Sequence, residues 1–351
     1  MRYLLLPVSW LYSVTIALRH LLYDLGLLNR YSANIPVISV GNLSMGGTGK
    51  TPHIEYLIRL FKANYRVATL SRGYKRKTSG FLLADAHSKV TDIGDEPKQF
   101  LTKFNDIFVA VDEKRKRGIR ILLAMEKAPD IILLDDAFQH LPVKSGMNIL
   151  LTDYHHLYTK DYLFPTGTLR DNRKSAKNAD IIIVTKTPTV FSPFIADELY
   201  GKIKPRPHQK LFFSYLKYGK LKPVQKNSYF AVPRNLSSVL LVTGIANTYP
   251  LKEYLQPQCT VLIELGFPDH HQYTEKDVQL IEKKFNDIIG KNKIIVTTEK
   301  DAVRFRDSEY LRIFEQIPLF YLPIEVAFHS TKGISFDEMM LDYVRKNQRN
   351  S

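Results

Sequence analysis

The chain has 351 residues, which is too long for one ordinary hydrophobic core and predicts about two domains. It carries 50 Lys and Arg against 35 Asp and Glu, and the net charge of +15 favours an anionic partner: nucleic acid, an anionic membrane surface or a phosphorylated substrate. The single cysteine, Cys259, excludes an internal disulfide, and nothing in that count indicates an oxidising compartment.

Residues 1–30 predict a helix that lies in a membrane interface. The stretch is apolar but broken by Pro7 and Ser9, so it is shorter than the ~20 mostly apolar residues that a simple span needs. No small-residue cleavage site typical of a secretory signal is evident. The polar residues form one stripe at spacings of four, seven and four: Ser9, Ser13, His20 and Asp24. The alternative is a helix docked on the protein's own core.

Residues 34–51 run from an apolar, β-branched stretch into a glycine-rich loop, as in a phosphate-binding strand, loop and helix. The loop glycines permit positive φ and close approach, so that backbone N–H groups point at a polyphosphate. Lys50 is expected to reach the β- and γ-phosphates, and the Thr51 hydroxyl to bind Mg²⁺. The motif departs from its usual form at Ser44, where glycine is expected. The predicted nucleotide-binding residues are Ser44, Met45, Gly46, Gly47, Thr48, Gly49, Lys50 and Thr51.

After this loop, apolar runs alternate with helical stretches, and this alternation predicts an α/β fold with a parallel, doubly wound sheet. The runs are 66–70, 107–111, 131–134, 147–151 and 181–184. In such sheets ligands lie beyond the carboxyl ends of the strands, so we expect the chemistry just after each run.

Charged residues follow several of these runs. Asp135 and Asp136 come directly after the third run, where two adjacent carboxylates favour a Mg²⁺ ligand over the alternative, a cap of the next turn. The segment 71–77 contains Arg72 and is dense in cations; it either clamps an anionic substrate or is solvated surface. Asp95 lies before a predicted helix and is either a helix cap or a free carboxylate.

The composition changes to Pro, Lys and Thr over 191–235, and this change predicts a connector. Beyond it, a second set of apolar runs alternates with a helical segment and predicts a smaller α/β domain. The expected division is an N-terminal helix over 1–30, a nucleotide-binding domain over 31–190, the connector, and a second domain over 236–351.

The most reactive-looking stretch of the second domain contains Asp269, His270 and His271. Adjacent histidines beside an aspartate bind a metal, orient a base or occupy a polar turn. No other Cys or His cluster is near them in the sequence, which argues against a structural zinc site.

Seven motifs in this order resemble the tetraacyldisaccharide 4′-kinase family, the lipid A kinases of Gram-negative bacteria. They occupy 40–52, 70–74, 94–97, 135–140, 165–170, 267–271 and 298–301, and the resemblance extends from the N-terminus to about Arg304. A Gly-Lys-Thr loop alone is common among NTPases, whereas seven ordered motifs are specific. This chain has Ala137 where the family usually has glycine.

The resemblance implies transfer of the γ-phosphoryl group of ATP, with Mg²⁺, to the 4′-hydroxyl of an acylated glucosamine disaccharide 1-phosphate, which gives lipid IV-A. It implies two α/β/α domains, the first a P-loop core, joined by a β-strand linker. It also implies an N-terminal helix on the cytoplasmic face of the inner membrane.

The resemblance further implies roles for individual residues. Asp95 is implied as the general base, with His270 as its partner, and we place Asp136 with them among the catalytic residues. Thr51 and Asp135 are implied to hold Mg²⁺. Arg115 and Arg170 are implied to face phosphate. To these we add Arg72, from the cation-dense segment, and Asp269, which is either a substrate contact or a support for His270.

Two other functions fit part of the sequence. One is a P-loop GTPase or ATPase, although the Asn-Lys-x-Asp of a guanine site is reduced to Lys186 after the run 181–184. The other is a membrane-bound nucleotide-binding module without transfer activity. The cations expected to face anionic lipid and the substrate are Arg2, Arg19, Arg30 and the segment 72–77. We expect no nucleic acid partner, because no recognisable binding module concentrates the charge, and no protein partner is evident.

Overall fold

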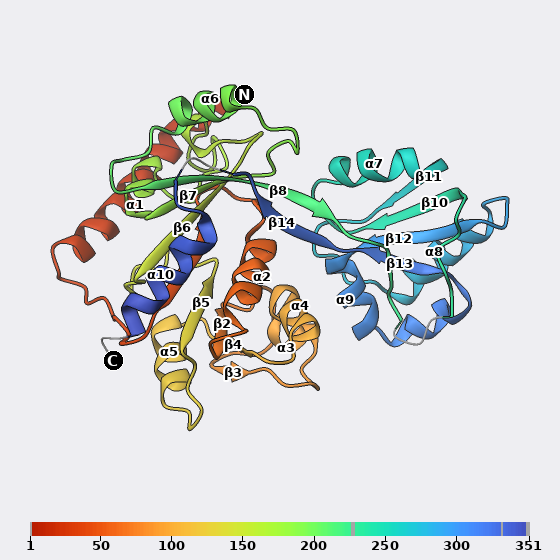
Figure 1. Cartoon of the computed structure of the whole chain (residues 1–351), viewed down its shortest axis with the longest axis horizontal. Coiled ribbons are helices and arrows are strands. Elements are labelled where there is room, and N and C mark those ends of the chain that lie inside the picture. Colours follow the sequence, from red (N-terminus) through yellow and green to blue (C-terminus); the bar gives the residue numbers. More distant parts are fainter. Residues whose placement is uncertain (1, 226–228, 331–332, 349–351) are drawn as a thin grey trace.

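The computed structural model describes residues 2–225, 229–330 and 333–348, without the side chains of Arg2, Tyr3 and Glu309. Two α/β domains lie side by side, and two strands run between them (Figure 1). Each domain is built around a mostly parallel sheet, so the predicted fold class is confirmed.

The described residues of the first domain form a nine-stranded sheet in the order β14-β8-β7-β6-β1-β5-β2-β4-β3. Its inner strands are parallel, whereas β3 and β14 pair antiparallel at the two edges. The strands are β1 (Val37–Asn42), β2 (Val67–Ser71), β3 (Leu82–Leu83), β4 (Phe108–Val111), β5 (Ile131–Asp135), β6 (Met147–Asp153), β7 (Ile181–Thr185), β8 (Lys210–Tyr218) and β14 (Ile324–Phe328). The predicted runs are therefore strands.

Helices cover both faces of this sheet, which explains why its inner strands are apolar on both sides. Alternate residues of one strand enter different cores: Ile38 packs with Leu57, and Val37 packs with Ile119 on the opposite face. One face is covered by α2 (Lys50–Phe61), α4 (Asp95–Lys103) and α10 (Phe336–Gln348), the other by α5 (Arg115–Leu123) and α6 (Pro193–Ile203). The short α3 (Val90–Ile93) precedes α4.

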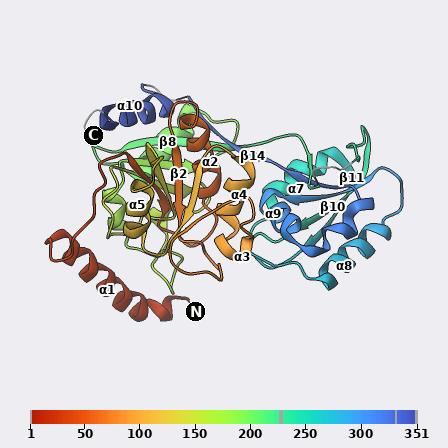
Figure 2. The ribbon, with the colours of Figure 1, turned by 90° about the horizontal axis from the view of Figure 1, so that it is seen from below.

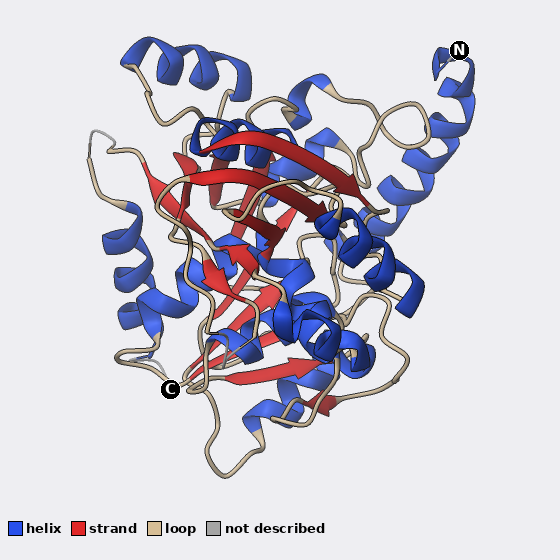
Figure 3. Cartoon of the chain, turned by 90° about the vertical axis from the view of Figure 1, so that its right-hand side faces the viewer, coloured by secondary structure: helices blue, strands red, loops and turns tan. Residues whose placement is uncertain are grey.

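The second domain has a five-stranded sheet, within the described residues, in the order β11-β10-β12-β13-β9. Its strands are β9 (Lys222–Pro223), β10 (Leu236–Thr243), β11 (Cys259–Gly266), β12 (Lys293–Thr298) and β13 (Leu319–Leu322). Its helices are α7 (Tyr249–Leu255), α8 (Glu275–Asn286) and α9 (Glu299–Asp307), and they flank the sheet in Figure 3, where this domain faces the viewer. Short 3₁₀ turns occur at Arg2–Leu5, Tyr158–Lys160, Arg173–Asn178, Gln256–Gln258 and Glu309–Gln316.

The domain boundaries differ from the predicted ones in two places. The expected connector 191–235 contributes α6 and β8 to the first domain. Residues 324–348, expected in the second domain, return to the first: β14 pairs with β8, and α10 buries Phe336 and Met340 in the core beneath α2. The second domain is therefore an insertion between β8 and β14.

Helix α1 (Leu6–Asp24) lies along the outside of the first domain (Figure 2). The predicted polar stripe exists and faces the protein: Ser9 Oγ lies 2.7 Å from Thr166 Oγ1, and Ser13 Oγ donates to Asn172 at 3.0 Å. His20 Nε2 lies 3.2 Å from the Asp171 carboxylate. The apolar side of the helix points outward. Among the described residues, no helix combines the length and apolar character needed to cross a bilayer.

His53 connects α2 with strand β8. Its Nδ1–H donates to the Gly49 carbonyl at 2.7 Å, so its Nε2 accepts from the Ser214 hydroxyl at 3.0 Å. Burial lowers the pKa of His53 to about 4, and the hydrogen bond to Gly49 only partly opposes this shift. The ring is therefore neutral in the folded protein at neutral pH.

The unfolding free energy is expected to fall as the pH drops from 6.5 towards 4, because the unfolded chain binds a proton that the buried His53 ring excludes. The loss attributable to His53 is on the order of 3 kcal/mol by pH 4. Urea denaturation over this range, compared between wild type and His53→Gln, measures it. An equal pH dependence in both proteins would contradict the assignment.

Candidate active site

The glycine-rich loop follows the carboxyl end of β1, at the centre of the sheet, and leads directly into α2. Gly46 and Gly49 have φ of 113° and 89°, a conformation that disfavours side chains. Gly47 has no positive φ, but open space surrounds the place where a Cβ would stand. The loop thus has the backbone conformation and the space expected for a phosphate-binding loop.

Neighbouring loops hold the glycine-rich loop in place. Met45 N donates to Thr168 O at 2.6 Å, and the Thr185 hydroxyl donates to Thr48 O at 2.9 Å. The side chain of Ser44, which replaces the expected first glycine, is buried, and the residue forms a β-bridge with Leu169. Serine therefore fits the loop without distorting it.

Lys50, Asp136 and Arg170 form an ionic network beside the loop. Lys50 Nζ lies 3.7 Å from the Asp136 carboxylate and donates to Asn42 Oδ1 at 3.2 Å. Arg170 donates to both oxygens of Asp136, at 3.0 and 2.8 Å, and to Asn42 Oδ1. Burial raises the pKa of Asp136, but the hydrogen bonds from Arg170 and the charge of Lys50 outweigh burial and lower this pKa to about 2. Asp136 is therefore an anion that positions two cations.

Asp135 ends β5 and lies in a different environment from its neighbour. Its Oδ1 is buried without a hydrogen-bond partner among the described residues, and its Oδ2 receives only a long contact of 3.5 Å from the Ser71 hydroxyl. Burial, with the charges of Glu96 and Asp136, raises its pKa to about 7. A carboxylate that lacks donors fits a hard divalent cation, so Asp135 and the Thr51 hydroxyl suit Mg²⁺.

Two further arginines belong to this region. Arg115 is buried: its Nη2 donates to the Asp135 carbonyl at 3.4 Å, and its Nε has no partner among the described residues. Burial lowers its pKa, as expected for a guanidinium enclosed by the protein. Arg72 is exposed after β2, close enough to Arg115 for their charges to interact. Both predicted cations therefore lie near Asp135.

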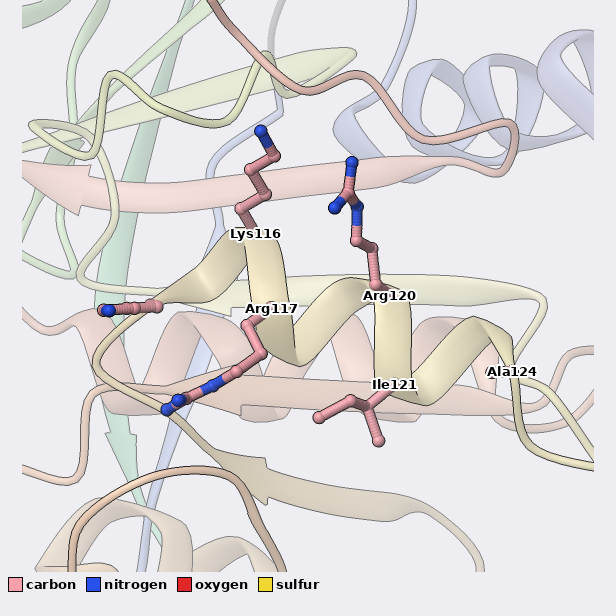
Figure 4. A pocket seen from close by; sticks show the side chains of 6 residues that line it. Lys116, Arg117, Arg120, Ile121 and Ala124 are labelled. Atoms are coloured by element: carbon pink, nitrogen blue, oxygen red, sulfur yellow. The ribbon is translucent and has the colours of Figure 1, made fainter.

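The outer face of α5 has a different character. Lys116, Arg117 and Arg120 line a shallow hollow of about 350 Å³ along this helix (Figure 4). Arg117 is held by two hydrogen bonds to Asp112. Of the cations of α5, Arg115 is buried at the site, whereas Arg117 and Arg120 are exposed and contact Asp112 and the Tyr31 ring.

Asp95 and His270 come together from the two domains. Asp95 is the first residue of α4, preceded by Gly94 as the N-cap, and His270 lies in the loop after β11. His270 Nδ1 is 2.6 Å from Asp95 Oδ2. Asp95 is thus neither a cap nor a free carboxylate, the two alternatives left open by the sequence. A Cβ at Gly94 would stand 3.0 Å from the Tyr74 carbonyl oxygen, so the start of α4 lies against the loop that follows β2. Because β1, β5 and β2 are parallel, that loop is at the same edge of the sheet as the glycine-rich loop.

The other polar residues near His270 support the loop. Asp269 is half-exposed, with its carboxylate 3.9 Å from His270 Nε2. His271 Nε2 lies 2.9 Å from Asp277, and its ring stacks on Phe267. His271 therefore fixes the loop, and Asp269 flanks the free nitrogen of His270.

Arg304 is a site residue that the sequence reasoning did not identify. Its segment reads as a capped helix start, and Thr298 does accept from Asp301 N at 3.1 Å. The side chain of Arg304, however, reaches across the domain interface to Asp95. The available signal was the spacing of Asp301 and Arg304, which places them on one helical face.

Comparisons with known proteins identify the family of this chain. A family model described as Tetraacyldisaccharide-1-P 4'-kinase matches residues 1–344. Tetraacyldisaccharide 4'-kinases of Parabacteroides distasonis and Bacteroides thetaiotaomicron are 46% and 43% identical to this chain, cover 99% of it, and are covered over 96% and 94% of their own length. A crystal structure of LpxK from Aquifex aeolicus in complex with ATP is 26% identical, with a TM-score of 0.74 and 99% coverage of both chains. The chain therefore belongs to the tetraacyldisaccharide 4′-kinase family.

Proposed function

We propose that this protein transfers the γ-phosphoryl group of ATP to the 4′-hydroxyl of a tetraacyldisaccharide 1-phosphate. The observation that carries the proposal is an aspartate–histidine pair assembled from both domains, in a chain that also has a phosphate-binding loop at the carboxyl end of β1. Family membership supports the choice of nucleotide and acceptor. In lipid A synthesis this reaction gives lipid IV-A.

The first task of the site is to bind and neutralise phosphate, because phosphoryl transfer requires positioning and charge more than covalent chemistry. Lys50 and the loop amides face the β- and γ-phosphates, and the helix dipole of α2 adds to their attraction. Arg115 and Arg170 supply further positive charge. Mg²⁺ held by Thr51 and Asp135 would neutralise charge on the phosphate oxygens. The unpartnered atoms of Thr48, Asp135 and Arg115 are where such ligands fit.

The second task is to handle the proton of the sugar hydroxyl. The hydroxyl oxygen bonds to the γ-phosphorus, the bond to the bridging oxygen breaks, ADP leaves, and the hydroxyl proton passes to Asp95. Asp95 Oδ2 already accepts from His270 and Arg304, and Oδ1 accepts from Arg304 Nε, so one lone pair of Oδ1 remains for the hydroxyl. His270 fixes the direction of the carboxylate. In a loose transition state the proton moves late, so orientation matters more than basicity.

The test is transfer of labelled γ-phosphate from ATP to purified disaccharide 1-phosphate. The proposal predicts ATP consumption that depends on the disaccharide and a lipid product with one additional phosphate. ATP or GTP hydrolysis without a lipid product would instead favour another P-loop enzyme. Nucleotide binding without turnover would favour a module that lacks transfer activity.

We also propose that α1 holds the protein on the cytoplasmic face of the inner membrane. Its polar stripe is used in contacts with the protein, which leaves large apolar residues facing outward, among them Trp10 (69% exposed) and Leu18 (55% exposed). Aromatic and basic residues on such a helix suit the headgroup region. A hollow of about 500 Å³ beside α1, lined by Ala17, Leu163 and Lys174 among others, offers room for part of a lipid.

Replacing Trp10 and Leu18 by glutamate is expected to reduce binding to anionic phospholipid vesicles at least about tenfold, because two large side chains lose their burial in lipid. Co-sedimentation measures the change. The matched control is Ile289→Glu, which alters an equally apolar side chain, 94% exposed, in the second domain. Equal pelleting of the wild type, the variant with both Trp10 and Leu18 replaced, and Ile289→Glu would contradict membrane binding through α1.

A further inference from the structure

Arg304 of α9 makes the most extensive contact between the two domains around Asp95. Its Nε donates to Asp95 Oδ1 at 3.1 Å, and its Nη2 donates to Asp95 Oδ2 at 2.7 Å. Both residues are buried: Arg304 is 6% exposed, and Asp95 is 9% exposed. This two-point contact fixes the plane of the carboxylate as well as its position.

The guanidinium is itself held by its own domain. Arg304 Nη1 donates to Asp301 Oδ1 at 2.7 Å and lies 3.4 Å from Gly244 O. Asp301, which is fully buried, accepts at Oδ2 from Gly244 N at 3.0 Å. His270 N also donates to Gly244 O, at 3.3 Å. Arg304 and His270 are therefore built on one frame around Gly244.

We propose that Arg304 is a positioning residue for phosphoryl transfer: it docks Asp95 of the first domain into the frame of the second domain that carries His270. This inference rests on the proposed function. Asp95 and His270 lie on different domains, so their separation depends on how the domains meet. Arg304 makes this domain contact specific, since its two N–H donors reach both carboxylate oxygens only when the carboxylate lies in the plane of the guanidinium.

The contacts explain why arginine occupies this position. Lysine would offer a single cationic nitrogen and could not hold both oxygens of Asp95 while also bonding to Asp301. Arginine donates to Asp95 Oδ1, to Asp95 Oδ2 and to Asp301 Oδ1 at once, and it leaves one lone pair of Asp95 Oδ1 for the substrate. Other interdomain ion pairs on α9, such as Lys98 with Asp307 at 3.3 Å, do not contact the Asp95 carboxylate.

Arg304 also sets the charge of Asp95. Burial opposes it, but the hydrogen bonds from His270 and Arg304 hold the pKa of Asp95 well below its usual range. The charged and titratable groups around the Asp95 carboxylate and its two partners, His270 and Arg304, are Lys300, Glu96, Asp301, Asp269 and Tyr74. Loss of Arg304 should raise the pKa of Asp95, so the variant enzyme should lose activity as the pH falls through a range in which the wild type is unaffected.

The test is a double-mutant cycle with Arg304→Met and Asp95→Asn, measured as phosphate transfer to the disaccharide 1-phosphate. Arg304→Met is expected to lower kcat between about 10- and 100-fold, with the KM for ATP within about twofold of wild type. In the Asp95→Asn background the same substitution is expected to change kcat less than about twofold, because Arg304 acts through Asp95. Arg304→Lys should recover part of kcat, since it keeps a buried cation.

The matched control is Lys98→Met, which breaks another ion pair between the same two helices and should leave kcat near wild type. ATP affinity by calorimetry and the Tm report folding; if Arg304→Met unfolds, Arg304→Lys replaces it in the cycle. The proposal is overturned if kcat changes less than twofold, or if the loss is equal with and without Asp95. A wild type without disaccharide phosphorylation would instead refute the proposed function.

Discussion

Replacing Asp95 by asparagine is expected to lower kcat by about 10²–10⁴-fold, the usual loss when a general base is removed. Asparagine is close in size and retains one oxygen, but it cannot take the hydroxyl proton and cannot accept the full fork of Arg304. The KM for ATP should change little, because in the proposed mechanism the nucleotide is bound by the glycine-rich loop between β1 and α2 and not by the Asp95 carboxylate. Steady-state kinetics at saturating disaccharide measure the effect.

The control for this substitution is Asp106→Asn. Asp106 is an exposed carboxylate that pairs with Lys62 at 3.0 Å, and an ion pair of this kind contributes little to stability. Its kcat should equal that of the wild type. Nearly full turnover of Asp95→Asn at saturating substrate would show that another group handles the proton.

Replacing Lys50 by alanine is expected to lower kcat by about 10²–10³-fold, the cost of removing one donor aimed at charge that develops in the transition state. ATP should also bind more weakly, because the ammonium group no longer faces the β- and γ-phosphates. The fold should persist, since Arg170 still pairs with Asp136 through two hydrogen bonds. Labelled phosphate transfer and calorimetric ATP binding, measured on the same preparation, separate the two effects.

Lys62→Ala is the matched control, because Lys62 caps the other end of the same helix and contacts Asp106 on the surface. It should retain wild-type transfer. If Lys50→Ala kept more than half of the wild-type kcat/KM, the glycine-rich loop would not be the phosphate site.

Most inner strands could be predicted because runs such as 131–134 and 181–184 are apolar at every position, as strands covered on both faces must be. Strand β8 was missed because its pattern is interrupted by Ser214 and Lys217 within a polar segment. The return of β14 and α10 to the first domain could not be read locally. Their core partners, such as Leu57, lie almost 300 residues earlier in the chain.

The residues of the candidate site also differ in whether the local sequence could predict their position. Asp135 at the end of β5 and the glycine-rich loop after β1 lie at the carboxyl edge of the sheet, as expected, because a parallel sheet brings those ends together. The contact of Asp95 with His270 was expected from the family resemblance, and the structure brings the two together. Arg304 meets Asp95 across a sequence separation of 209 residues, and nothing in its local sequence indicates that partner.

The insertion of the second domain between β8 and β14 has a consequence for biosynthesis. Phe336, Met340 and Val344 complete the hydrophobic core beneath α2, yet the ribosome makes them only after the whole inserted domain. Until then, the core of the nascent first domain is exposed and the outer edge of β8 has no partner strand. Exposed apolar surface and unpaired strand edges are prone to aggregation, so both are surfaces that chaperones protect. The inserted domain, whose strands are contiguous in the chain, is able to fold first.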